Sequence, residues 1–137
     1  MTKNAMSFLL LILLTAVVAS ASPGDSTNGH GVANTVGSFV FDAKETGSGA
    51  ITGKVRFVSL NIDIEVDCLI ISGDIAIIGG TDVANPSTTY AFKVTDNGGG
   101  ATADKITLPQ VGQTCATFNT LGNFSLTSGD IEVRDQP

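Results

Sequence analysis

The stretch over residues 61–82 constrains the fold of this chain most. At its start, apolar residues alternate strictly with charged ones: Ile62, Ile64, Val66 and Cys68 against Asp63, Glu65 and Asp67. Successive side chains of a strand point to opposite faces, so the alternation predicts a strand with one buried and one solvated face. A helix would scatter the same carboxylates around its circumference.

A tight turn follows at residues 72–74, where Ser, Gly and Asp supply typical turn chemistry. Beyond the turn, Ile75, Ile77 and Ile78 resume a β-branched pattern, and the Gly79–Gly80 pair predicts a bulge or bend. Residues 61–82 are therefore predicted to form a central β-hairpin.

The first residues have the pattern of a signal for protein export. Lys3 precedes an apolar run over residues 8–19, and Ala19, Ser20 and Ala21 fit a small-residue cleavage site. We predict a signal peptide over residues 1–21 and a secreted, extracellular protein whose mature chain does not insert into a membrane. An uncleaved N-terminal anchor is the alternative.

Charge and composition limit the classes of molecule that this protein is expected to bind. Thirteen acidic residues outnumber seven basic ones, and an acidic surface repels nucleic acid and anionic membranes. The chain has no Trp and one Tyr, which disfavours the exposed aromatic platforms that bind sugars or bases. We therefore expect the protein to bind another protein or to self-assemble.

Cys68 and Cys115 are the two cysteines of the chain. An oxidising compartment favours a disulfide between them, and two buried free thiols are the alternative. A metal site built from two cysteines and the distant His30 has too few ligands.

Residues 22–35 are rich in Gly, Ser, Asn and Thr and are predicted to form a flexible N-terminal arm. Residues 36–137 are predicted to form one domain. In addition to the central hairpin, we expect strands over residues 36–43, 51–60, 88–95, 105–108, 114–118, 124–126 and 131–134, with a second Ser-Gly-Asp turn at 128–130. This spacing predicts an all-β fold, a single antiparallel β-barrel or β-sandwich of about eight short strands with one disulfide.

Several short motifs follow one another along the chain. They are Phe39-Val40-Phe41, Gly53-Lys54-Val55, Asp67-Cys68-Leu69, Ser72-Gly73-Asp74, residues 92–98, Asp104-Lys105-Ile106, Cys115 and residues 128–133. As an ordered set they resemble a family of small secreted bacterial proteins related to the post-COAP-1 domain. The resemblance covers nearly the whole mature chain. It implies an all-β domain, sometimes appended to larger surface proteins, and it implies no activity. The loop over residues 96–104 is more glycine-rich than its counterpart in that family.

That loop is the candidate ion site. Asp96, Asn97 and Asp104 flank glycines, and calcium prefers carboxylate and carbonyl oxygens on a flexible turn. The alternating ligands of known calcium loops are missing, so an ordinary long hairpin loop is the competing interpretation. No other cofactor is expected.

Asp63, Glu65 and Asp67 are the candidate partner-binding residues. They form a row of carboxylates spaced by roughly 7 Å along one strand face. Such a row could contact a basic partner or a cation. The alternative is a solvated face that blocks pairing of the strand edge.

Catalytic groups are scarce. The one histidine, His30, lies in the predicted arm, where nothing holds it within reach of a substrate. We therefore expect a non-enzymatic extracellular domain with a structural, adhesive or assembly role. The alternatives are a barrel that holds a small apolar ligand and, less well supported, a hydrolase.

Overall fold

The computed structural model describes residues 24–98, 103–120 and 122–136. The predicted signal peptide lies outside these residues. Within the described residues, nine strands follow one another: β1 (Ser26–Ala33), β2 (Gly37–Glu45), β3 (Ile51–Phe57), β4 (Ile62–Ser72), β5 (Ile75–Asp82), β6 (Thr89–Thr95), β7 (Lys105–Ile106), β8 (Gln110–Val111) and β9 (Phe124–Arg134).

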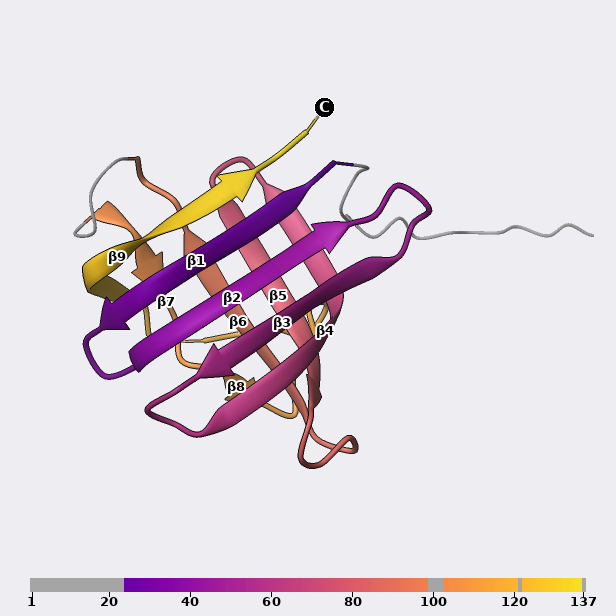
Figure 1. Cartoon of the computed structure of the whole chain (residues 1–137), viewed down its shortest axis with the longest axis horizontal. Helices are drawn as coiled ribbons and strands as arrows, with labels where there is room; N and C mark the ends of the chain where they lie inside the picture. Colours follow the sequence, from indigo (N-terminus) through magenta and orange to yellow (C-terminus); the bar gives the residue numbers. More distant parts are fainter. Residues whose placement is uncertain (1–23, 99–102, 121, 137) are drawn as a thin grey trace, which may run out of the picture.

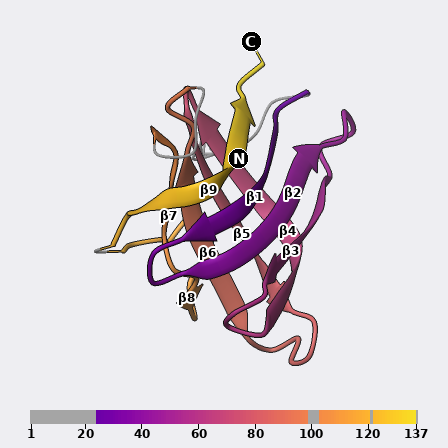
Figure 2. The same ribbon diagram turned by 60° about the vertical axis from the view of Figure 1, so that its left-hand side comes forward.

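Eight of these strands close into an antiparallel barrel (Figures 1 and 2). The order around the wall is β5-β4-β3-β2-β1-β9-β7-β6, and β5 pairs with β6 to complete the circle. Strand β8 pairs with β6 in addition. The all-β prediction is confirmed, and of its two architectures the barrel is the one observed.

The interior of the barrel holds aromatic and branched side chains. The Phe92 ring meets Phe57 and Phe41 edge to face, with ring centroids 5.0 and 5.7 Å apart. The buried aliphatic side chains around them come from most of the wall: Val36, Val55, Ile64, Val66, Leu69, Ile71, Ile78, Val94, Ile106, Leu126 and Ile131. An eight-stranded barrel has an interior just wide enough for such packing.

The central hairpin is confirmed as β4 and β5, joined by the turn after Ser72. A register shift between Val66 and Cys68 leaves Asp67 as an extra residue in β4, opposite the glycines of β5. The bulge reverses which residues face inward, because side chains alternate along a strand. The expectation that Cys68 shares the buried face of Val66 is therefore wrong: Leu69 points inward instead.

The disulfide between Cys68 and Cys115 is confirmed. It lies on the outside of the wall over Gly79, where an added Cβ atom would come within 2.6 Å of the Cys68 Sγ. Residues 114–118 form a turn around Cys115, so the strand expected there is wrong.

The expectation of a flexible arm over residues 22–35 is wrong for residues 26–33. These form β1, which pairs with β2 on one side and β9 on the other. The composition of residues 22–35 predicted a flexible arm because it contains few large apolar side chains. Backbone pairing with β2 and β9 keeps this strand in the barrel instead. Gly29 faces inward, and a Cβ atom there would come within 2.8 Å of the Phe41 ring.

The prediction of a second turn at the Ser-Gly-Asp sequence is also wrong, because residues 128–130 lie inside the continuous strand β9. Gly129 has a φ of 100° and lies opposite Gly31 of β1. A Cβ atom at Gly129 would collide with the His30 carbonyl oxygen. The glycine therefore allows two strands to approach closely, and the chain does not reverse direction.

Candidate functional site

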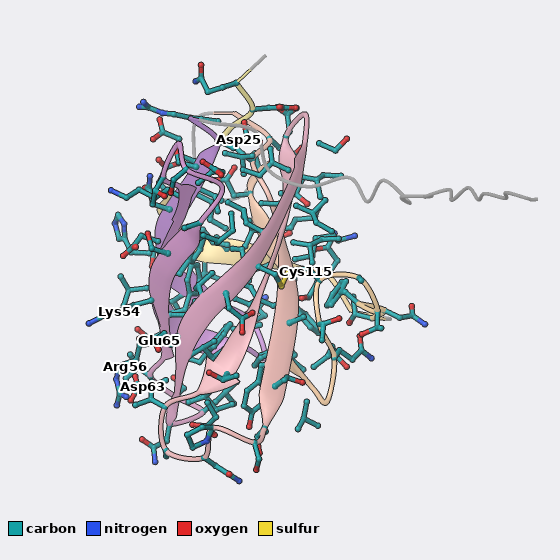
Figure 3. The ribbon with its side chains drawn as sticks, turned by 90° about the vertical axis from the view of Figure 1, so that its right-hand side faces the viewer. Asp25, Lys54, Arg56, Asp63, Glu65 and Cys115 are labelled. Carbon is teal, nitrogen blue, oxygen red and sulfur yellow. A yellow bond between two sulfur atoms is a disulfide. The ribbon has the colours of Figure 1, made fainter. Side chains whose placement is uncertain are left out.

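The outer wall over β2, β3 and β4 carries a row of side chains with both charges at its centre (Figure 3). In this row Val40 pairs with Arg56, Arg56 with Asp63, and the Val83 N–H donates to the Asp63 carbonyl at 2.9 Å. The Arg56 Nη1 lies 2.7 Å from the Asp63 Oδ2, and both side chains remain almost half exposed. Val40 and Val83 at the two ends are exposed at 50% and 62%.

A second row lies two residues further along the strands. It runs from Asp42 through Lys54 and Glu65 to Thr81, each paired in register with the next. Lys54 is therefore flanked by a carboxylate on each neighbouring strand. Figure 3 shows Lys54 and Arg56 beside Glu65 and Asp63 on the same side of the molecule.

Two depressions hollow this wall. The first has a volume of about 420 Å³ and is lined by both rows from Val40 to Val83. The second, of about 590 Å³, shares Asp42, Lys54 and Glu65 with the first and extends to Asp67 and Thr81. They adjoin each other through these shared residues, so the wall offers one continuous hollowed surface with apolar ends and a charged centre.

The second depression forms where β3 and β4 part. Their ladder covers four residue pairs, from Lys54 with Glu65 to Phe57 with Ile62. Beyond it the bulge at Asp67 turns β4 away, and Figure 3 shows the two strands diverging above Lys54 and Glu65. Desolvation raises the pKa of the Asp67 carboxyl, and its own backbone N–H offsets part of that rise.

The predicted row of carboxylates is present, but its three members do not share one environment. Asp63 and Glu65 each face a basic residue of β3, while Asp67 stands apart at the bulge. The basic partners of Asp63 and Glu65 were missed, although the sequence indicates them. Lys54 and Arg56 have the same two-residue spacing as Asp63 and Glu65, and a short turn joins the two strands, so cross-strand pairs are expected. A partner-binding role for the carboxylates stays a prediction.

The three residues of the candidate ion site do lie together, but backbone groups engage their oxygens. The Asp104 carboxylate accepts hydrogen bonds from the Asn97 N–H at 3.0 Å and the Ile131 N–H at 2.8 Å. The Asp96 carboxylate accepts from Gly98 and Val133 at 3.1 Å each. The Asn97 side chain donates to the Ala103 carbonyl at 2.6 Å. The arrangement ties the loop after β6 to β9.

Asp104 is fully buried. Burial raises the pKa of its carboxyl, the N–H groups of Ile131 and Asn97 lower it in part, and the charges of Asp96 and Asp130 raise it. Within residues 24–98, 103–120 and 122–136, no three His, Cys, Asp or Glu side chains are grouped to hold a metal ion. Residues 99–102 of the loop lie outside that range. We therefore treat Asp96, Asn97 and Asp104 as a structural clasp and do not propose a calcium site.

His30 lies on the outer wall in β1, paired with Val40 on one side and Asp130 on the other. It is exposed, and the strand holds its backbone in place. The expectation that His30 lies in a flexible arm is therefore wrong.

The fold and its surface define a class: a disulfide-linked antiparallel barrel with a filled interior and a charged, hollowed outer wall. No protein-family model, curated protein or solved structure matches the chain. The resemblance to the post-COAP-1-related family therefore stays a prediction. Among the described residues, no helix has the length and apolar character needed to span a bilayer.

Proposed function

We propose that this is a secreted, non-enzymatic domain with a structural, adhesive or assembly role, and that it acts through protein contacts of its outer wall over β2–β4. The observation that carries the proposal is the contrast between the two faces of that wall. Inside, Phe57 of β3 and Ile64 of β4 are fully buried in the packed core. Outside, the same strands carry exposed charges and a depression of about 420 Å³.

The composition of the depression supports contact with another protein. Protein interfaces combine an apolar part with polar, hydrogen-bonding groups, and arginine is enriched in them. Val40 and Val83 supply exposed apolar surface, and Arg56 lies between them. An apolar ligand inside the barrel is not favoured, because side chains already occupy the interior.

Export is part of the same proposal. The basic start, apolar run and small residues before position 22 are typical of a signal peptide. The Cys68–Cys115 disulfide is compatible with an oxidising, extracellular compartment.

Carbodiimide crosslinking of protein in its natural setting tests the proposal, because this reagent joins amines to carboxylates that are in contact. We expect Lys54 to form crosslinks to carboxylates of other protein chains. Lys93 on β6, on another side of the barrel, is the matched control and should form few. A Lys54–Glu65 crosslink within one chain and one between two copies yield the same peptides, so the crosslinked species are first separated by mass. Lys54 crosslinks found only in material of monomer mass would contradict the proposal.

A further inference from the structure

We propose that the outer wall over β3 and β4 binds the same wall of a second copy of this chain. The inference rests on the proposed function and names the partner. It comes from the order of side chains across the wall, which reads Val40, Arg56, Asp63, Val83: apolar, positive, negative, apolar.

This order is self-complementary under a two-fold rotation. Consider an axis that lies between two facing copies, runs parallel to the strands and passes between β3 and β4. The rotation places β3 of one copy opposite β4 of the other at the same height along the strands. Arg56 then faces the Asp63 of the second copy, and Val40 faces its Val83. Such isologous contacts are the commonest route to dimers.

The second row obeys the same symmetry. Lys54 and Glu65 are paired in register within one chain, so the same axis places Lys54 opposite the second copy's Glu65. Each symmetric contact occurs twice, which gives four ion pairs between the copies. Both charge rows would match at once. A docking displaced by one strand across the wall would place β3 opposite β3 or β4 opposite β4 and bring like charges together, which fixes the strands that face each other.

The surface is available for this contact. Arg56 and Asp63 are 43% and 48% exposed in their side chains despite their mutual ion pair. The depression of about 420 Å³ between the apolar ends leaves room for the long basic side chains of a facing copy. Exposed ion pairs contribute little one by one, so we expect a weak dimer with a dissociation constant in the micromolar range or above.

Two oppositely charged variants test the pairing. Lys54→Glu with Arg56→Glu makes the wall acidic, and Asp63→Lys with Glu65→Lys makes it basic. By sedimentation velocity we expect wild-type protein to dimerise reversibly, each variant alone to stay monomeric, and an equimolar mixture of the two to form a heterodimer. Circular dichroism and unfolding curves establish that each variant is folded.

A single substitution supplies a test that does not depend on rebuilding the charges. Val83→Asp puts a carboxylate opposite Val40 of the second copy, and we expect the dissociation constant to rise about tenfold or more. Val111→Asp is the control, because Val111 is 67% exposed on β8, away from this wall. It should leave the dimer unchanged.

Salt provides a further readout. Raising the ionic strength from about 0.1 M to about 1 M shortens the Debye length from about 10 to about 3 Å and should weaken the dimer.

Wild-type protein that stays monomeric at the highest soluble concentration would overturn the inference. So would a mixture of the two charge variants that fails to associate. If Lys54 still crosslinks to other proteins in that case, the proposed function stands and only the second copy as partner is rejected.

Discussion

Asp104 joins three segments of the barrel through one buried residue. Its carboxylate accepts N–H groups from Asn97 in the loop after β6 and Ile131 in β9, and its carbonyl accepts the Leu126 N–H at 3.1 Å. An amide in place of the carboxylate would turn an NH₂ group toward one of these donors.

We therefore expect Asp104→Asn to lower the free energy of unfolding by about 1–3 kcal/mol, the cost of one buried unpaired N–H. Urea unfolding followed by circular dichroism measures the change. Asp130→Asn, an exposed neighbour on β9, should change stability by less than about 0.5 kcal/mol. Equal losses in the two variants would contradict the clasp.

The same residue gives a pH dependence with a defined sign. Burial raises the pKa of Asp104 in the folded protein, so the folded chain binds its proton more tightly than the unfolded chain does. Its contribution to stability is full below the ordinary carboxyl pKa of about 3.9 and is lost as the pH rises through the raised folded pKa. The difference in unfolding free energy between wild type and Asp104→Asn should therefore shrink over that interval. A difference that grows with pH would show that the pKa is lowered instead.

Gly79 is the residue over which the disulfide packs. A Cβ atom there would lie 2.6 Å from the Cys68 Sγ and 3.2 Å from the Cys115 Sγ. We expect Gly79→Ala to destabilise the protein by about 1–3 kcal/mol, typical of overpacking. The loss should largely disappear in a Cys68→Ala, Cys115→Ala background, as a double-mutant cycle would show. An unchanged loss in that background would place the clash elsewhere.

At the scale of the elements, β1 is the strand that decides whether the barrel closes. It joins β2 to β9, and its pairing with each covers the full strand. The amide protons of residues 27–32 should exchange with solvent as slowly as those of β2, because both are central strands of one wall. A flexible arm would exchange within the dead time of a hydrogen-exchange measurement.

The elements also show what sequence patterns reveal and what they miss. The alternation at Ile62–Asp67 and the turn at Gly73 were sufficient to predict the central hairpin. The bulge at Asp67 was not predictable in place, because the residue that bulges depends on β5 as well as β4. Strand β1 was missed because its glycines and small polar residues carry no hydrophobic periodicity.

The same limits apply to the candidate site. The acidic side of the wall was predicted from β4 alone, at Asp63 and Glu65. The matching basic side was not predicted, because the register of β3 against β4 decides which residues meet Asp63 and Glu65, and the pattern of one strand does not determine that register. Asp96, Asn97 and Asp104 were predicted as a group, as a candidate calcium site. Their hydrogen bonds to β9 could not be predicted, because Ile131 lies far along the chain from Asp104.

At the scale of the whole molecule, the disulfide reinforces a barrel that strand pairing already closes. It links residues 47 positions apart on the outer wall. Replacing both cysteines with Ala should cost about 3–4 kcal/mol by the loop-entropy relation and leave the β-sheet circular dichroism spectrum unchanged. Loss of the spectrum in the double variant would show that strand pairing alone does not maintain the barrel.

The central claim is that the barrel is filled by its own side chains and works through its outer surface. Native mass spectrometry of protein purified from its natural source tests this most directly. We expect the mass of the polypeptide with one disulfide, alone or bound to other protein chains. A small apolar molecule that copurifies at a fixed ratio, and that the charge variants of the outer wall still retain, would contradict the claim, because it would then be held in the barrel interior.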